Sequence, residues 1–350
     1  MIPEFYKDFS LAPKLIVLIV FISVGIFFLV KFCDLFVDSS SVLAKKLHIS
    51  PMIIGLTVVA MGTSCPELAV SVSDSIDCLL NGGNANVALG NVIGSNICNI
   101  FLVLGISLCF TPVLISKLSI KKEFPILLFV TIVCAIFGIF FGINSITGNY
   151  AILRWEGIIL VVLMFGYITF LIIDSKNSHT KAIFLPEIKE IKLCKSIIYI
   201  IIGAIGIAIG GELVVFGAKG LSITCADALK LNHDLTESLV GLTIVAVGTS
   251  LPELVTSVIA AKKGQKELAL GNIIGSNIFN ILFVLGISAT VCPLTSGNEI
   301  FFDLIVMCFA TILLFTLAFN QKIGKKTGIL FLCLYCIYVS YLIIRTIGII

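Results

Sequence analysis

Residues 55–67 read GLTVVAMGTSCPE and residues 241–253 read GLTIVAVGTSLPE, with 10 of 13 positions identical. A second matched pair follows: residues 88–107 read ALGNVIGSNICNIFLVLGIS and residues 269–288 read ALGNIIGSNIFNILFVLGIS, with 16 of 20 positions identical. Two matched blocks in the same order indicate an internal duplication. The fold is therefore expected to contain two copies of one unit.

The composition of the chain indicates the solvent in which it folds. Of 350 residues, 59% are hydrophobic and 12% are charged, whereas soluble domains carry about 25% charged residues. This predicts an integral membrane protein whose main partner is the lipid bilayer. The net charge of +3 is small, and the lysines surround apolar stretches instead of forming a basic patch with aromatic residues, so nucleic acid is not expected as a partner.

Charges, prolines and turn residues divide the chain into ten apolar segments, each near the roughly 20 residues that a helix needs to cross a bilayer. They cover residues 15–43, 51–76, 85–111, 124–144, 155–174, 195–222, 237–261, 268–291, 300–319 and 327–347. Five segments per copy is an odd number, so the second copy enters the membrane the opposite way up. The predicted fold class is an all-α polytopic membrane protein with ten transmembrane helices in two inverted five-helix repeats. The expected boundaries are residues 1–174 for the first repeat, 175–194 for a cytoplasmic linker and 195–350 for the second repeat.

The distribution of lysine predicts the orientation. With the N-terminus outside, sixteen basic residues fall in the inside loops and only five in the outside segments. Because positive charge accumulates on the cytoplasmic side, both termini are expected to face out.

The GTSxPE segments carry polar groups inside apolar sequence, where an unsatisfied polar group costs several kcal/mol and marks an ion or substrate pathway. Pro66 has no N–H for the carbonyl of Gly62, so a backbone oxygen is freed from helix bonding. Thr63 and Ser64 lie four and three residues before Glu67, which places the three side chains toward one helix face. The second copy repeats the arrangement with Pro252, Gly248, Thr249, Ser250 and Glu253.

The second pair of blocks supplies a matching polar stripe on an apolar helix. Its members recur every four residues and are Asn91, Ser95 and Asn99 in the first copy and Asn272, Ser276 and Asn280 in the second. Glycines in the same blocks, Gly90, Gly94, Gly271 and Gly275, allow another helix to approach closely. Hard cations such as Ca²⁺ prefer oxygen ligands of these kinds.

With GTSxPE followed by GNxxGSNxxN in each half, the chain resembles the cation/calcium exchanger superfamily, and most of all its prokaryotic sodium/calcium exchangers. The resemblance covers both repeats. It implies that Glu67 and Glu253 are central ion ligands for Ca²⁺ and Na⁺, together with the hydroxyls of Thr63, Ser64, Thr249 and Ser250. It further implies ligation by Ser95, Asn99, Ser276 and Asn280, and by main-chain oxygens of Ala60 and Ala246.

One position departs from part of that superfamily. Potassium-dependent members, and some potassium-independent ones, carry a carboxylate at the position of Asn280. With Asn280 here, two carboxylates remain, enough to neutralise one Ca²⁺, so the exchanger is expected to be independent of K⁺.

The expected function is secondary active antiport that exports Ca²⁺ in exchange for Na⁺ by alternating access. The alternative is an H⁺-coupled exchanger in which the two glutamates trade Ca²⁺ for protons, and a passive channel is a third hypothesis, disfavoured by inverted halves. No nucleophile and base pair or phosphate loop appears in the sequence, so an enzyme is not expected, nor is a cofactor. We expect a protein that functions as a monomer in a prokaryotic cell (inner) membrane.

The cysteines, and the charged residues outside the motifs, are expected to have structural roles. Most of the twelve cysteines, including Cys33, Cys98, Cys134, Cys292 and Cys308, stand singly in apolar runs and are expected to pack as small hydrophobic residues. Asp34 and Asp38 lie near Lys31, so interfacial ion pairs are expected in preference to an ion entry path.

Overall fold

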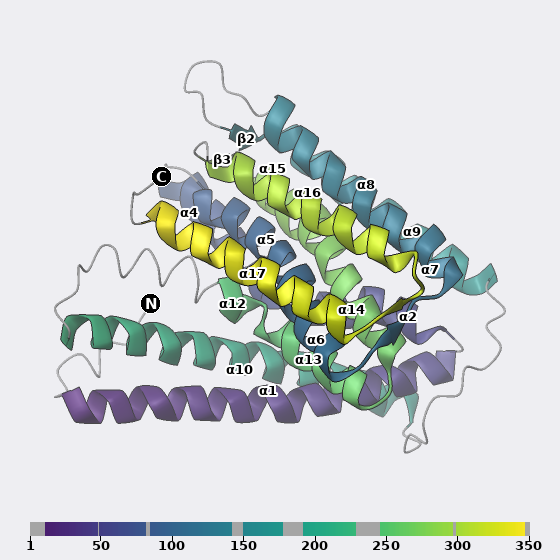
Figure 1. Ribbon diagram of the computed structural model, residues 1–350, viewed down its shortest axis with the longest axis horizontal. Helices are drawn as coiled ribbons and strands as arrows, with labels where there is room; N and C mark the ends of the chain where they lie inside the picture. Colours follow the sequence, from purple (N-terminus) through teal and green to yellow (C-terminus); the bar gives the residue numbers. More distant parts are fainter. Residues whose placement is uncertain are drawn as a thin grey trace.

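The computed structural model describes residues 11–47, 49–81, 85–141, 150–177, 192–228, 246–296 and 299–346, and these are mostly helical (Figure 1). The first half contains α1 (Leu11–Leu47), α2 (Pro51–Ile54), α3 (Ala60–Thr63), α4 (Cys65–Asn81), α5 (Asn86–Cys98), α6 (Leu104–Phe110), α7 (Lys117–Lys121), α8 (Glu123–Ile136) and α9 (Arg154–Asn177). The second half contains α10 (Leu193–Ala228), α12 (Ala246–Thr249), α13 (Leu251–Lys262), α14 (Lys266–Phe279), α15 (Gly286–Val291), α16 (Glu299–Ala318) and α17 (Lys325–Thr346). Wider π-helical turns are η2 (Gly55–Val59), η3 (Asn99–Val103), η4 (Phe137–Phe141) and η6 (Asn280–Leu285).

Within the described residues, eight helices are long and apolar enough to cross a membrane. The bent pair Pro51–Thr63 and Cys65–Asn81, with 49° between its parts, gives a ninth. The expected seventh segment, residues 237–261, begins outside the described residues, and α12 and α13 form its described part. The protein is therefore a helical, multi-pass membrane protein.

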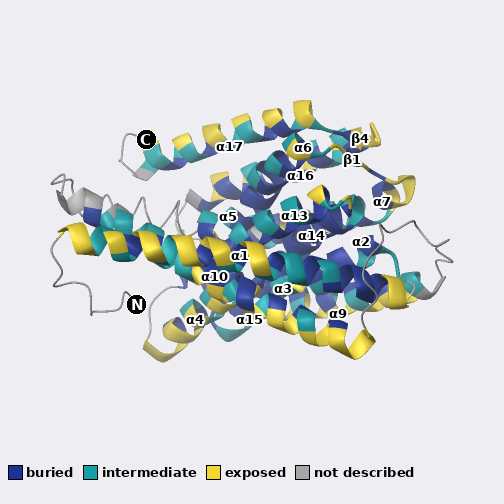
Figure 2. Ribbon diagram, turned by 90° about the horizontal axis from the view of Figure 1, so that it is seen from below, coloured by how far each residue is buried: buried dark blue, intermediate teal, exposed yellow. Residues whose placement is uncertain are grey.

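Burial follows the arrangement expected in a bilayer (Figure 2). The centre is formed by helices such as α14, in which every residue from Leu268 to Phe279 is buried. Large apolar side chains are exposed on the outer helices, including Phe27 on α1, Val162 on α9 and Ile337 on α17. A lipid-facing surface of this kind costs little, because hydrocarbon chains solvate it as well as a protein core does.

Two long helices, α1 and α10, run side by side along one side of the molecule (Figure 1). Phe21 and Phe216 meet edge to face with ring centroids 4.8 Å apart. At the other end of the pair, the Ser196 hydroxyl donates a 2.6 Å hydrogen bond to the carbonyl of Ser39. The two helices therefore pack along their length.

Helix α14 lies directly against the backbone of residues 52–56. A Cβ at Gly271 would lie 2.5 Å from the carbonyl oxygen of Met52 and 3.1 Å from Cα of Gly55, and a Cβ at Gly275 would lie 2.7 Å from the carbonyl oxygen of Leu56. The close approach predicted for these two glycines is confirmed. At Gly90 a Cβ would meet nothing within 4 Å among the described residues.

Two short antiparallel strand pairs connect the halves. Strand β1 (Val113–Leu114), just after α6, pairs with β4 (Lys322–Ile323), just before α17. Strand β2 (Tyr150–Ile152), just before α9, pairs with β3 (Leu294–Ser296), just after α15. Each pair joins the strand that follows a GNxxGSNxxN helix in one half to the strand that precedes the last helix of the other half.

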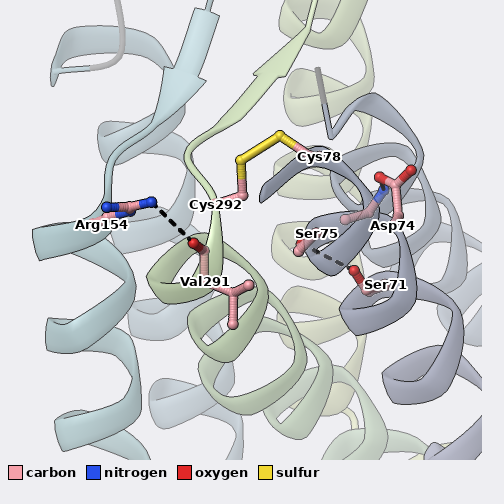
Figure 3. Close-up of a disulfide and its surroundings, with 8 residues drawn as sticks. Ser71, Asp74, Ser75, Cys78, Arg154, Val291 and Cys292 are labelled. Carbon is pink, nitrogen blue, oxygen red and sulfur yellow. Dashed lines mark hydrogen bonds between the residues drawn. A yellow bond between two sulfur atoms is a disulfide. The ribbon is translucent and has the colours of Figure 1, made fainter. Parts of the chain in front are cut away.

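A disulfide also joins the halves (Figure 3). Cys78 near the end of α4 is bonded to Cys292 directly after α15, with 6.5 Å between their Cα atoms. Nearby, Arg154 donates a hydrogen bond to the carbonyl of Val291, and Asp74 accepts one from the backbone N–H of Ala88 in the first turn of α5. The prediction that Cys292 packs as an isolated hydrophobic residue is wrong, because the fold brings two helix ends together that lie 214 residues apart in sequence.

The acidic residues of α1 pair with a lysine distant in sequence. Lys263, in the turn between α13 and α14, lies 2.8 Å from Asp38 and 3.0 Å from Asp34. Partial burial lowers the pKa of Lys263, but the hydrogen bonds and negative charges of the two aspartates outweigh burial, so the pKa is raised. The interfacial pairing expected for Asp34 and Asp38 is present, with Lys263 as the partner instead of Lys31.

Candidate functional site

The first GTSxPE motif interrupts its helix. Helix α3 ends at Thr63, Ser64 adopts φ −85° and ψ 10°, and α4 begins at Cys65. Pro66 causes this break, since it has no N–H to return to the preceding turn and its ring crowds that turn. The Thr63 hydroxyl is within hydrogen-bond distance of the carbonyls of Val59 (3.1 Å) and Ala60 (3.3 Å), which lie in the turn that the break weakens.

The second motif has the same local conformation. Helix α12 ends at Thr249, Ser250 has φ −86° and ψ 2°, and α13 begins at Leu251 with Pro252 in its first turn. The identical residues of the two copies therefore produce nearly identical breaks. In both copies the glutamate lies in the first turn after the break, as Glu67 in α4 and Glu253 in α13.

The two glutamates are fully buried, and their carboxyl groups interact electrostatically with each other. Glu253 accepts a 2.9 Å hydrogen bond from the Ser64 hydroxyl of the other copy and a longer one, 3.5 Å, from Ser276. Neither carboxylate oxygen of Glu67 makes a hydrogen bond within the described part of the chain. A buried carboxylate without such bonds is costly unless a cation or proton compensates it.

The polar stripe on the second blocks lies in the same buried region. Ser95, Asn99, Ser276 and Asn280 are all fully buried. Asn99 opens the π-helical turn η3 and Asn280 opens η6, and π-turns are frequent at functional sites. Among the described residues, both amide atoms of each asparagine and the hydroxyl of Ser95 have no hydrogen-bond partner.

The stripe and the motifs contact each other across the two copies. Thr63 lies 3.1 Å from Oδ1 of Asn272 and 3.4 Å from the hydroxyl of Ser276, both in the second copy. The matching contact is a 3.4 Å hydrogen bond from Thr249 to Oδ1 of Asn91 in the first copy. The sequence placed Asn91 and Asn272 on the stripe without assigning them a role, and their periodicity was the only available signal.

The remaining candidates are main-chain oxygens and one serine. The carbonyl of Ala60 accepts from the N–H of Ser64 at 3.0 Å and lies 3.3 Å from the Thr63 hydroxyl, so ligation by Ala60 needs one of these contacts to give way. Ala246 is the first residue of α12. Ser250 is buried, and its hydroxyl has no partner within the described residues.

The site thus combines two carboxylates with several hydroxyl and amide oxygens in the buried centre of the protein. Carboxylate, hydroxyl and carboxamide oxygens are the ligands that hard cations prefer, Ca²⁺ taking about six to eight. The described part of the chain holds no group of three or more His, Cys, Asp or Glu side chains placed for a metal. Among the candidate ligands, the neutral hydroxyl and amide groups outnumber the two carboxylates.

A family model described as sodium/calcium exchanger protein matches residues 17–173 and 195–344. The chain belongs to the sodium/calcium exchanger family. The exchanger is 32% identical over 354 residues to a sodium/calcium exchanger of Methanosarcina acetivorans, covering 91% of this chain and 96% of that protein. It is also 34% identical over 319 residues to a membrane protein of Methanocaldococcus jannaschii, with 91% and 95% covered.

Solved structures agree with this assignment. A structure of the sodium-calcium exchanger NCX_Mj superposes on the exchanger with a TM-score of 0.76 at 33% identity, covering 93% of this chain and 98% of that one. That structure concerns extracellular ion exchange and induced occlusion of the binding site in NCX_Mj. Family membership and this structural match support cation/Ca²⁺ antiport by a multi-pass membrane protein.

Proposed function

We propose that the exchanger exports Ca²⁺ in exchange for Na⁺, without a requirement for K⁺, at a site built around Glu67 and Glu253. The observation that carries the proposal is the hydrogen bond from Ser64 of one copy to the buried carboxylate of Glu253 in the other, in a buried region that also holds Glu67. The two negative charges of the site balance one Ca²⁺ or two Na⁺. A third bound Na⁺ gives the loaded site a net charge of +1. Because Asn280 is neutral, the site provides no third carboxylate to balance an additional K⁺.

The proposed ligands are the residues named from the family motifs. They are Glu67, Glu253, Thr63, Ser64, Thr249, Ser250, Ser95, Asn99, Ser276 and Asn280, with main-chain oxygens of Ala60 and Ala246. The unpartnered amides of Asn99 and Asn280 support this assignment, since a buried polar group without a hydrogen bond is expensive and a bound cation relieves that cost.

The proposed architecture is ten transmembrane helices in two inverted five-helix repeats, residues 1–174 and 195–350. The reciprocal strand pairs, β1 with β4 and β2 with β3, support inversion. Each repeat contributes one strand after its GNxxGSNxxN helix and one strand before its last helix, and each strand pairs with the opposite kind from the other repeat. The family match leaves residues 174–194 unmatched, which agrees with a linker at 175–194. Most of that linker, residues 178–191, lies outside the described residues.

We propose that both termini face outward from a prokaryotic inner membrane and that one chain suffices for transport. Two independent observations support the orientation. The positive-inside rule places the ends of α4 and α15 outside, and these ends carry the Cys78–Cys292 disulfide, which forms in oxidising compartments.

The proposed mechanism is alternating access with mutually exclusive occupancy. Without cations, the charges of Glu67 and Glu253 repel each other in a region of low dielectric. The unloaded protein therefore resists the rearrangement that exposes the site to the other side. Loading by Ca²⁺ or by Na⁺ removes the repulsion, so only loaded forms cross, and the inward Na⁺ gradient drives Ca²⁺ out.

Radiolabelled Ca²⁺ uptake into sodium-loaded proteoliposomes tests the function. We expect uptake that requires the outward Na⁺ gradient, is unchanged when external K⁺ is omitted and persists with a protonophore. Uptake driven by a pH gradient in the absence of Na⁺ would establish the H⁺-coupled alternative instead. Flux without any countergradient would identify a channel.

A further inference from the structure

Asn91 and Asn272 occupy equivalent positions in the two GNxxGSNxxN blocks, four residues before Ser95 and Ser276. Both are buried, Asn272 completely. Each uses its amide in two directions, toward a serine of its own copy and toward a threonine of the other copy. The two sets of contacts match, so the same arrangement occurs in both copies.

The donor side of each amide contacts its own copy. Nδ2 of Asn272 donates a 3.0 Å hydrogen bond to the hydroxyl of Ser257 on α13. Nδ2 of Asn91 donates a 3.0 Å hydrogen bond to Ser71 on α4 and a 3.3 Å one to the carbonyl of Glu67. Ser71 and Ser257 stand four residues after Glu67 and Glu253, so each serine lies one turn beyond its glutamate.

The acceptor side of each amide contacts the threonine of the opposite copy. Oδ1 of Asn272 lies 3.1 Å from the Thr63 hydroxyl, and Oδ1 of Asn91 lies 3.4 Å from the Thr249 hydroxyl. With Nδ2 committed to the serine, Oδ1 is the atom that faces the threonine. A carboxamide oxygen only accepts, so the threonine hydroxyl is the donor in this contact. For Thr63, the asparagine shares this donor with the carbonyls of Val59 and Ala60, 3.1 and 3.3 Å away in the same helix.

We infer that Asn91 and Asn272 are positioning residues that help to orient the hydroxyls of Thr249 and Thr63 from the other copy, so that the threonine lone pairs face the cation. A hydroxyl binds a cation through its lone pairs, and a proton pointing at the cation opposes binding. The asparagines act through the threonines, without touching the ion. This inference rests on the proposed cation site and adds to it two residues that orient ligands.

The test is equilibrium binding of radiolabelled Ca²⁺ to the purified full-length protein, measured for Asn272→Leu, Thr63→Val and the double variant. Because a hydrogen bond that orients a ligand contributes about 1 kcal/mol, each single change should weaken the Kd about fivefold to tenfold. In the Thr63→Val background, Asn272→Leu should weaken it less than twofold further. If the fold-changes in Kd of the two single variants multiply in the double variant, the inference is overturned, because Asn272 then acts independently of Thr63.

Matched controls separate positioning from packing. Asn277→Leu changes a buried asparagine on the same helix whose Nδ2 donates to the carbonyl of Ile273, and it should leave the Kd unchanged. Ser257→Ala removes only the partner of Nδ2, so it tests the same chain of contacts if Asn272→Leu fails to fold. It should weaken the Kd about twofold to threefold in the wild-type background and not in Thr63→Val. An equal effect in both backgrounds would also overturn the inference.

The binding readout separates this inference from the proposed function. If the wild type binds Ca²⁺ and transports it, while Asn272→Leu binds as the wild type does, the positioning role fails alone. If the wild type binds no Ca²⁺ and transports none, the proposed function fails and the positioning role with it. Asn91→Leu with Thr249→Val should repeat the non-additive pattern in the other half.

Discussion

Ser64 donates a 2.9 Å hydrogen bond to the carboxylate of Glu253, although 189 residues separate them in the chain. The contact joins the hydroxyl of one GTSxPE motif to the glutamate of the other. Both groups are buried. The two copies therefore contribute to one buried polar region, and neither half holds it alone.

Ser64→Ala should weaken Ca²⁺ transport by raising KM. A hydrogen bond to a charged group contributes about 1.5–3 kcal/mol, which corresponds to at least tenfold in apparent affinity. Initial rates of Na⁺-driven Ca²⁺ uptake over a range of Ca²⁺ concentrations provide the measurement. Ser107→Ala is the matched control, since the hydroxyl of that buried serine bonds to the carbonyl of Val103 in its own helix. Equal KM values for the two variants would contradict the assignment of Ser64.

Asn280→Asp should make Ca²⁺ uptake dependent on pH. At low pH the introduced carboxyl group is protonated and neutral, as asparagine is. As pH rises it ionises, the site then carries three negative charges against the two positive charges of Ca²⁺, and an uncompensated charge within the membrane costs several kcal/mol. Uptake should therefore fall with rising pH more steeply than in the wild type. Parallel pH profiles would show that position 280 does not contribute to the charge of the site.

The disulfide predicts a covalent link between the halves. A protease site inserted after residue 184, in the expected linker, should yield one full-size band on a denaturing gel without reductant and two fragments with reductant. Cys78→Ser should yield two fragments in both lanes. Two fragments from the unreduced, otherwise unchanged protein would exclude the Cys78–Cys292 bond.

Lys263→Gln should lower Tm by a few degrees at most, because the ion pairs with Asp34 and Asp38 are partly exposed. High salt should reduce the difference. The pKa of Lys263 is raised, so its contribution is present below the ordinary lysine pKa and is lost only as pH rises through the higher folded-state value. The difference should thus persist from about pH 6 to about pH 9. Lys266→Gln serves as a control. An equal decrease in Tm for Lys266→Gln would show that the ion pairs of Lys263 make no specific contribution to stability.

The duplicated motifs and the cost of polar groups in lipid can be read from the sequence itself. They sufficed to predict a helical membrane protein and to single out the buried polar residues around Glu67 and Glu253. Helical periodicity states which residues share a face, but it does not state which residues of another helix that face meets. The bonds of Asn272 to Thr63 and of Cys78 to Cys292 depend on that missing information. For the same reason, the charge partner of Asp38 is Lys263 and not the nearby Lys31.

The most direct test of the central claim compares Na⁺-driven Ca²⁺ uptake by the wild type, Glu67→Gln, Glu253→Gln and the control Glu156→Gln. Glu156 is fully buried on α9, where it accepts a hydrogen bond from the N–H of Leu153, so its substitution tests burial of a glutamate outside the site. Both site variants should lose at least a hundredfold in uptake, since each leaves one carboxylate against a divalent cation, while Glu156→Gln should transport as the wild type does. Uptake that survives in Glu67→Gln or Glu253→Gln, in protein confirmed to be folded and inserted, would contradict a site built on the two carboxylates.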